Sequence, residues 1–294
     1  MSLAVALLAL ALGSCATVGS YTRMVSVHNA GVRFRGTYEH LAADIVYSER
    51  SDVALDVYSP ADGAAHPVFV FVHGGGWNSN TKELFAPIAM RLVPRDVVVV
   101  IPAYTLYPEA TYTGMAREIA DAVSWVFESI HDYGGDPARV FLGGHSAGAH
   151  LSGLVAYDER WLRERGHSRR ALAGWIGLSG VYDGTAHVAW RAERGLETPT
   201  MTAVMEGAPN LDRASPLTYA SNPGGPPAWI VHGERDEIVT IEQSRSMHDA
   251  LRAAGTRSEL VIYPESDHGD YLSSDLAREQ PRLITDIVRI VRGR

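Results

Sequence analysis

Seven short apolar runs recur along the chain from residue 54 onward, separated by segments with helical periodicity. Apolar runs of this length are typical of strands that are buried on both faces of a sheet. The expected strands are residues 54–58, 68–72, 97–102, 140–143, 175–178, 228–231 and 260–263. The expected helices are residues 82–93, 115–131, 147–157, 241–254 and 275–291. This alternation predicts an α/β fold, with a mostly parallel sheet and helices on both of its faces.

Three further segments modify this simple pattern. Residues 43–47 and 54–58, joined by a short polar stretch containing Ser51 and Asp52, predict an antiparallel hairpin that leads into the sheet. Residues 158–170 and 184–215 do not fit the alternation and are interpreted as insertions. Because loops beyond the carboxyl ends of parallel strands build the functional site, we expect the second insertion to form a small lid. A decorated surface loop is the alternative.

The motif Gly144-His145-Ser146-Ala147-Gly148 lies between an expected strand and an expected helix. This is the context that G-x-S-x-G requires for a sharp turn that presents a serine nucleophile. Glycines are needed on both sides because the turn strains the serine backbone and leaves no room for flanking side chains. The hydroxyl of Ser146 then lies at a helix N-terminus, where developing negative charge is favoured.

A second glycine-rich motif, His73-Gly74-Gly75-Gly76-Trp77, directly follows the expected strand at residues 68–72. Its position and composition predict an oxyanion hole, in which backbone N–H groups stabilise the charge that forms on a carbonyl oxygen during acyl transfer. We expect the donors to be the N–H groups of Gly75, Gly76 and Ala147. A phosphate-binding loop is the rival interpretation, but the chain has no G-x-x-x-x-G-K-[ST] sequence.

A serine nucleophile needs a base and a carboxylate that orients the base. Asp236 follows the expected strand at residues 228–231, and His268 follows the strand at residues 260–263. Parallel strands bring both loops to the sheet edge that carries Ser146, so we predict a Ser146–His268–Asp236 triad. Three acidic neighbours are possible replacements for Asp236: Glu234, Glu237 and Asp267.

The remaining composition excludes several other classes of function. The net charge of −8 provides no basic stripe for a phosphate backbone, so nucleic acid is not an expected partner. No HExxH, CxxC or similar cluster is present, and therefore neither a metal nor another cofactor is implied. The other histidines in the motifs are expected to hold loops rather than transfer protons. They are His73, His145, His150 and His232.

Residues 1–12 are almost wholly apolar and lead through Leu12-Gly13-Ser14 to Cys15, the single cysteine of the chain. The apolar run is much shorter than the roughly 20 residues of a spanning helix, so it is interpreted as an export signal. The sequence around Cys15 resembles the bacterial lipobox, which implies lipidation and a membrane anchor in the cell envelope. No Lys or Arg precedes the run. A cleaved leader of a periplasmic or secreted protein and a plain apolar tail remain alternatives.

The expected organisation is therefore a leader at residues 1–20, an N-terminal arm at residues 21–40 and one catalytic domain at residues 41–294. The composition is uniform over this last range, and 46% of the whole chain is hydrophobic, which is enough for a sizeable core. The oligomeric state is left open.

Residues 41–294 resemble the esterase branch of the α/β hydrolases, which includes the hormone-sensitive-lipase-like carboxylesterases. The resemblance rests on HGGGW, GGDPARVFLGGHSAGAHL, HGERDEIV and DHG in the family's order. The Tyr133–Pro137 turn and GHSAGAH are closer to the exported bacterial esterases, prenylcysteine methylesterases and kynurenine formamidases. Residues 103–109, AYTLYPE, depart from the DYRLAPE of the lipase-like group. The resemblance implies the α/β-hydrolase fold.

The expected function is hydrolysis of small carboxylic esters with short-chain or aryl groups, through an acyl-enzyme on Ser146. Four aromatic side chains are candidates for lining a modest apolar pocket: Trp77, Tyr104, Tyr107 and Trp190. Each could equally belong to the protein core. An arylformamidase-type amide hydrolase is the first alternative, and a non-catalytic ligand-binding protein is a remote one.

Overall fold

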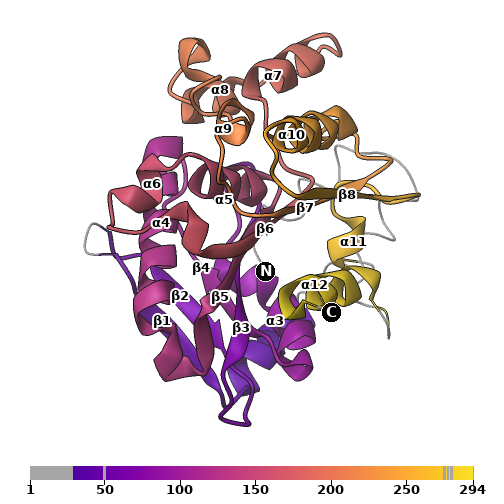
Figure 1. Ribbon diagram of the computed structural model, residues 1–294. Helices are drawn as coiled ribbons and strands as arrows, with labels where there is room; N and C mark the ends of the chain where they lie inside the picture. The colour runs from indigo at the N-terminus through magenta and orange to yellow at the C-terminus, as the bar shows by residue number, and fades with distance from the viewer. Residues whose placement is uncertain (1–28, 49–50, 274–275, 277, 279–280, 294) are drawn as a thin grey trace.

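The computed structural model describes residues 29–48, 51–273, 276, 278 and 281–293. In this part of the chain the strands form one eight-stranded sheet (Figure 1). Its strands are β1 (Leu41–Val46), β2 (Ala54–Tyr58), β3 (His66–Val72), β4 (Val98–Pro102), β5 (Gly135–His145), β6 (Leu172–Leu178), β7 (Ala228–Gly233) and β8 (Ser258–Tyr263).

The strands lie in the order β1-β2-β4-β3-β5-β6-β7-β8. β1 pairs with β2 and β2 pairs with β4 in antiparallel fashion, whereas all pairs from β4 to β8 are parallel. The predicted α/β architecture and the leading hairpin are therefore confirmed. Because β5, β7 and β8 are parallel, the loops that follow them meet at one edge of the sheet.

The helices cover both faces of the sheet. Their bounds are α3 (Ala86–Leu92), α4 (Tyr112–Ser129), α5 (Ala147–Tyr157), α6 (Arg160–Arg163), α7 (Gly184–Ala192), α8 (Pro199–Val204), α9 (Leu217–Ala220), α10 (Ile241–Ala253), α11 (Asp270–Ser273) and α12 (Arg282–Arg292). Short 3₁₀ turns are η1 (Lys82–Phe85), η2 (Val93–Arg95), η3 (Ile130–Tyr133), η4 (Arg169–Ala171) and η5 (Ala208–Asn210).

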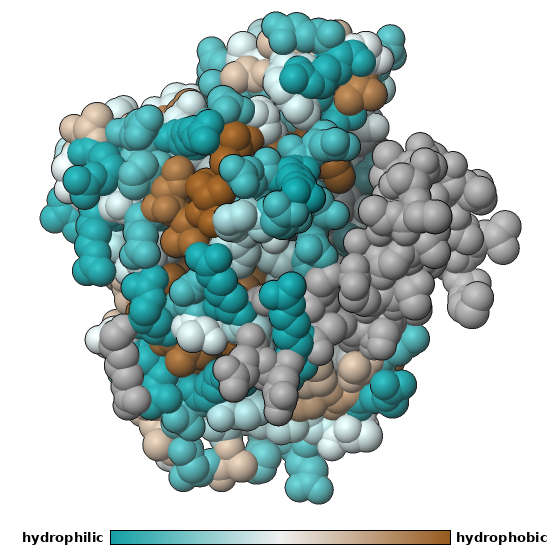
Figure 2. All heavy atoms as spheres, turned by 90° about the vertical axis from the view of Figure 1, so that its right-hand side faces the viewer, coloured by the Kyte–Doolittle hydropathy of each residue, from teal (hydrophilic) through white to brown (hydrophobic). Residues whose placement is uncertain are grey.

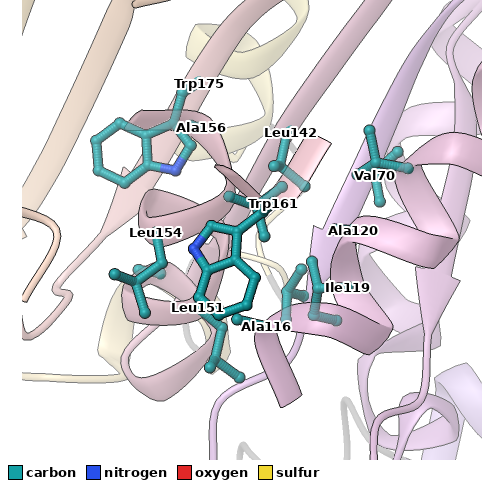
Figure 3. Packing of buried hydrophobic residues seen from close by; sticks show 14 of the residues in the cluster. Val70, Ala116, Ile119, Ala120, Leu142, Leu151, Leu154, Ala156, Trp161 and Trp175 are labelled. Atoms are coloured by element: carbon teal, nitrogen blue, oxygen red, sulfur yellow. The ribbon is translucent and has the colours of Figure 1, made fainter. Parts of the chain in front are cut away.

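Strand β3 explains why the apolar runs are continuous. Val68, Val70 and Val72 belong to a core shared with α4, α5 and α10, whereas Phe69 and Phe71 belong to a second core shared with α3 and α12. Successive side chains of a strand point to opposite faces, so both sets are buried. Figure 3 shows the first core, in which the indole of Trp161 lies between side chains of α4 and α5.

Several element boundaries differ from the sequence-based expectation. The expected helix at residues 82–93 consists of η1, α3 and η2, with prolines near the starts of α3 and η2. Proline fits the first turn of a helix but cannot continue one. The expected helix at residues 275–291 is represented by α12, which begins after Pro281. Residues 274–275, 277 and 279–280 lie outside the described part.

The segment before the sheet is tied to the domain by charged side chains. Residues 29–37 are helical, and Arg35 Nε of this helix donates to Asp56 Oδ2 over 2.7 Å. Lys82 Nζ donates to Asp56 Oδ1 over 2.8 Å. Asp56 and Lys82 are both buried. Buried charges are tolerated when they are paired in this way, so the helix at residues 29–37 is anchored to β2.

The insertion at residues 184–215 contains α7, α8 and η5, which lie at one end of the molecule beside α10 (Figure 1). The insertion at residues 158–170 contains α6 and the start of η4. In the face shown in Figure 2, hydrophilic side chains cover most of the described surface, and apolar ones gather mainly in one patch to the upper left of the centre. No helix among the described residues is long and apolar enough to cross a membrane.

Candidate active site

Ser146 occupies the turn between β5 and α5 with φ 54° and ψ −120°. A side chain at Gly144 or Gly148 would place its Cβ 2.5 or 2.1 Å from the carbonyl oxygen of Val72. Such contacts are impossible, so the two glycines allow the close approach of β3 to the turn. The strained serine backbone is the geometry that the G-x-S-x-G motif predicts.

Ser146, His268 and Asp236 come together at the carboxyl edge of the sheet. His268 Nε2 lies 2.9 Å from Ser146 Oγ, and His268 Nδ1 lies 2.7 Å from Asp236 Oδ2. A carboxylate accepts hydrogen bonds, so Nδ1 carries the proton and the lone pair of Nε2 faces the hydroxyl. This is the tautomer that can take a proton from Ser146.

Among the acidic candidates, Asp236 is the one that is hydrogen-bonded to His268. Its side chain is fully buried, and its Oδ1 accepts hydrogen bonds from the N–H groups of Ile238 and Val239 at 2.9 and 2.8 Å. Burial raises the pKa of Asp236, but hydrogen bonds from His232 and His268 outweigh that effect and hold the pKa well below its usual range. The carboxylate therefore stays ionised. The alternatives Glu234, Glu237 and Asp267 are exposed.

The backbone of His268 is held by His145, the residue that precedes the nucleophile. His145 Nε2 lies 2.7 Å from the carbonyl oxygen of His268, and the two rings are 4.8 Å apart. Burial lowers the pKa of His145 to about 3, so its imidazole is neutral and donates through Nε2. His145 therefore places no positive charge beside His268.

The glycine-rich loop after β3 turns two carbonyl groups inward. The carbonyl oxygen of Gly74 accepts a hydrogen bond from Asn80 Nδ2 at 3.1 Å. The carbonyl oxygen of Gly75 accepts two hydrogen bonds, from the N–H of Asn78 at 3.2 Å and from Ser79 Oγ at 2.6 Å. The N–H and C=O groups of a trans peptide point in opposite directions. The N–H groups of Gly75 and Gly76 therefore point out of this turn.

This loop lies against the nucleophile, because a Cβ on Gly74 would be 3.2 Å from Ser146 Cβ. Ala147 is the first residue of α5, and its N–H has no partner inside the helix. Backbone donors that point outward beside a serine suit the stabilisation of an oxyanion. The roles of Gly75, Gly76 and Ala147 as its donors remain predictions.

The four aromatic candidates lie in different surroundings. Trp77 and Tyr104 are almost fully buried, and their polar atoms bind His150 Nδ1 at 3.2 Å and the carbonyl oxygen of His73 at 3.0 Å. Tyr107 and Trp190 are half-buried. The first two support the oxyanion loop, and contact between substrate and any of the four remains a prediction.

The structure adds a histidine that the sequence analysis did not select. His187 of α7 is buried, its ring stacks on Trp190 at 5.9 Å, and it interacts electrostatically with His268 and Asp236. His187 therefore brings a side chain of the insertion within electrostatic range of the triad. A lone histidine in an irregular segment carries no spacing signal, so only the tertiary structure could identify it.

One group of side chains in the described residues has a geometry that could hold a metal ion. One ligand atom each of Asp62, His66 and Asp96 lies within 4.8 Å of the others. His66 begins β3 and Asp96 precedes β4, so this group lies at the amino edge of the sheet, opposite the triad. His66 is already hydrogen-bonded to Asp62 at 2.7 Å. The group therefore takes no part in the candidate active site.

Comparison with known sequences identifies related esterases. The model of the BD-FAE family matches residues 55–251. An isoprenylcysteine alpha-carbonyl methylesterase of Arabidopsis thaliana is 31% identical over 84% of the chain and 61% of its own length. Esterase LipQ of Mycobacterium tuberculosis is 31% identical over 87% of the chain and 64% of its own length. The chain thus spans about three fifths of these relatives.

Comparison with solved structures supports the same fold. An esterase of Thermogutta terrifontis aligns with a TM-score of 0.69 and 23% identity, over 87% of this chain and 94% of that one. A carbohydrate esterase from gut microbiota aligns with a TM-score of 0.73 and 19% identity, over 88% and 98% of the two chains. These similarities extend beyond the motif loops to the architecture as a whole.

Proposed function

Because the chain belongs to the BD-FAE family of α/β-hydrolase esterases, we propose that it is a serine carboxylesterase that acts through an acyl-enzyme. The observation that carries this proposal is the alignment of Ser146 Oγ, His268 and the ionised Asp236, with separations of 2.9 and 2.7 Å. Binding alone would not require these three groups to be connected in this order.

In the proposed reaction, Ser146 Oγ attacks the ester carbonyl while its proton passes to His268 Nε2. The resulting imidazolium is stabilised by Asp236, and the backbone N–H groups of Gly75, Gly76 and Ala147 bind the oxyanion. His268 then gives its proton to the departing alcohol. Water enters, loses a proton to the same nitrogen and attacks the acyl-enzyme. The acid leaves, and His268 returns the proton to Ser146 Oγ, which restores the enzyme.

We propose small esters with short acyl chains or aryl groups as the substrates. The solved structures of the Thermogutta esterase include complexes with propionate and butyrate, which gives this size class a precedent in the fold. The test is kcat/KM for p-nitrophenyl esters from acetate to decanoate. We expect a maximum between acetate and butyrate. A steady rise beyond eight carbons, with about 0.8 kcal/mol for each buried methylene, would contradict the short-chain assignment.

A second candidate is a methyl ester of a prenylated cysteine, because a curated relative that is 31% identical carries that activity in its name. The same assay panel should therefore include a farnesylcysteine methyl ester, and N-formylkynurenine for the formamidase alternative. Preference for p-nitrophenyl butyrate supports the first proposal. A kcat/KM at least about tenfold higher for either other compound would replace it, since tenfold corresponds to about 1.4 kcal/mol in transition-state binding.

We also propose that Cys15 is lipidated and anchors the catalytic domain, residues 41–294, to the bacterial cell envelope. Cys15 lies outside the described residues, so the support is the lipobox-like sequence and the apolar run before it. In a bacterial host the full chain should fractionate with membranes, whereas a Cys15→Ala variant should not. Identical fractionation of both, or Met1 retained on the mature protein, would exclude the anchor.

A further inference from the structure

One oxygen of Asp236, Oδ2, faces the ring nitrogens of two histidines. His268 Nδ1 lies 2.7 Å and His232 Nε2 lies 3.2 Å from Asp236 Oδ2. The other oxygen, Oδ1, is occupied by two backbone N–H groups. The carboxylate is thus surrounded by four donors, and only His268 among them belongs to the predicted triad. The second imidazole shares the very atom that orients His268.

The tautomer of His232 follows from its partners. Nε2 faces two acceptors, Asp236 Oδ2 and the carbonyl oxygen of Val239 at 2.9 Å, so this nitrogen carries the proton. Nδ1 then has the lone pair, and Ser244 Oγ lies 2.7 Å away as its donor. His232 and Ser244 are both completely buried, from β7 and α10. Water cannot replace either partner.

Building on the proposed esterase function, we propose that His232, held in one tautomer by Ser244, is a positioning residue for the triad. It fixes the rotamer of Asp236 and withdraws part of the negative charge that Asp236 offers to His268. Charge-assisted hydrogen bonds of this kind are the strong ones in protein interiors. The catalytic connection is then a buried row from Ser244 through His232, Asp236 and His268 to Ser146.

The charge on Asp236 affects catalysis because it stabilises the imidazolium of His268. If the N–H of His232 is removed, more negative charge remains for His268 and its protonated form is favoured. The acid limb of the profile, which is the pH range where kcat/KM falls as the pH is lowered, should therefore move to higher pH. Other groups that face this pair stay in place in such a variant: His145 before Ser146, His187 on α7, Tyr271 on α11 and Asp267 in the loop after β8.

The decisive comparison is His232→Leu against His66→Leu. Both histidines are buried and bonded to an aspartate, but the His66–Asp62 pair lies at the opposite edge of the sheet. With p-nitrophenyl butyrate, His232→Leu should lower kcat by about 10- to 100-fold, as expected for loss of a hydrogen bond to a charged group. KM should change little, and the acid limb should move upward in pH. His66→Leu should change neither kcat nor the limb.

A conservative variant separates positioning from simple packing. The amide of His232→Gln can present an N–H close to the position of Nε2, so it should recover most of kcat and return the acid limb toward its original pH. Ser244→Ala removes the donor to Nδ1 and should shift the limb in the same direction as His232→Leu, by a smaller amount. All assays are made below the unfolding temperature of the least stable variant.

Each outcome of these assays either supports or overturns the proposed role of His232. If His232→Leu folds and its acid limb lies at the same pH as that of the wild type, or at a lower pH, the proposal is overturned. If His232→Leu does not fold, an unchanged pH profile of Ser244→Ala overturns it instead. A wild-type protein without activity on any ester would refute the proposed function itself. A wild-type protein that is active, with variants whose profiles match it, would refute the role of His232 and leave the esterase proposal standing.

Discussion

The indole Nε1 of Trp77 donates a hydrogen bond to Nδ1 of His150, 3.2 Å away. The other nitrogen of His150, Nε2, lies 2.6 Å from the carbonyl oxygen of Ala214 in the segment after α8. Burial lowers the pKa of His150 to about 4, so the ring is neutral and carries its proton on Nε2. One imidazole therefore connects the oxyanion loop, the helix behind Ser146 and the insertion.

Replacement of this connector should destabilise the protein. His150→Leu leaves Trp77 Nε1 and the Ala214 carbonyl without partners in the interior, at a cost of about 1–3 kcal/mol for each group. Urea unfolding should show the loss in the free energy of unfolding. His248→Leu is the matched control, because His248 is only half-buried and water can replace its bond to Ser258 Oγ. Equal losses in the two variants would contradict this role of His150.

Removal of the nucleophile gives the most direct test of the mechanism. Ser146→Ala should keep the fold and lower kcat for p-nitrophenyl acetate by about 10³- to 10⁶-fold, the range found when one member of a triad is removed. His268→Ala should match it. Ser124→Ala is the control: Ser124 is a half-buried residue of α4 whose Oγ donates to Glu128, and the variant should retain full activity. Substantial activity in Ser146→Ala would mean that another group attacks the ester.

The glycine-rich loop allows a test of backbone geometry without removal of a side chain. Gly75 has φ +133°, and a Cβ there would lie 2.2 Å from the carbonyl oxygen of Ser79. Gly75→Ala must displace the loop, so kcat should fall by about 10²- to 10³-fold, as when one oxyanion donor is lost. Gly63 also has a positive φ, +71°, but open space lies around it, so Gly63→Ala is the control. It should cost stability alone, with kcat unchanged.

The sequence predicted the strands and the loop positions of Ser146, Asp236 and His268 because both depend on local signals. Apolar runs give the buried strands, and parallel strands bring Ser146, Asp236 and His268 to one edge whatever the detailed packing. Boundaries were less accurate. β5 begins at Gly135 rather than at residue 140, since its first part pairs with β3 at the exposed margin of the sheet and lacks a continuous apolar run.

The partners of the buried histidines could not be predicted. The sequence analysis expected His145, His150 and His232 to hold loops, and the structure shows each of them bonded to a carbonyl group of a loop. Their partners lie far apart in the chain; His150 and Ala214, for example, are 64 residues apart. Such pairings depend on the three-dimensional arrangement of the insertion and leave no spacing pattern in the sequence.

The buried histidines also predict how stability depends on pH. Burial lowers the pKa of His73, His150 and His187 to about 4 and that of His145 to about 3, against about 6.5 in an unfolded chain. Between pH 6.5 and 4 the unfolded chain therefore binds protons that the folded protein does not. The contribution of these groups to the free energy of unfolding is complete above pH 6.5. It is lost on acidification, by up to about 1.4 kcal/mol per pH unit for each group. Urea unfolding at pH 7, 6 and 5 measures this slope.

His187→Phe isolates one of these contributions. Nδ1 of His187 is buried without a hydrogen-bond partner, and its ring stacks on Trp190, so phenylalanine keeps the ring contact and sacrifices no bond at that atom. The variant cannot take up a proton in the unfolded state. Its stability relative to the wild type should therefore increase as the pH falls from 7 to 5, with a slope that is shallower by up to about 1.4 kcal/mol per pH unit. Parallel stability curves for the two proteins over this range would show that His187 titrates alike in the folded and unfolded states, which the burial of its side chain should prevent.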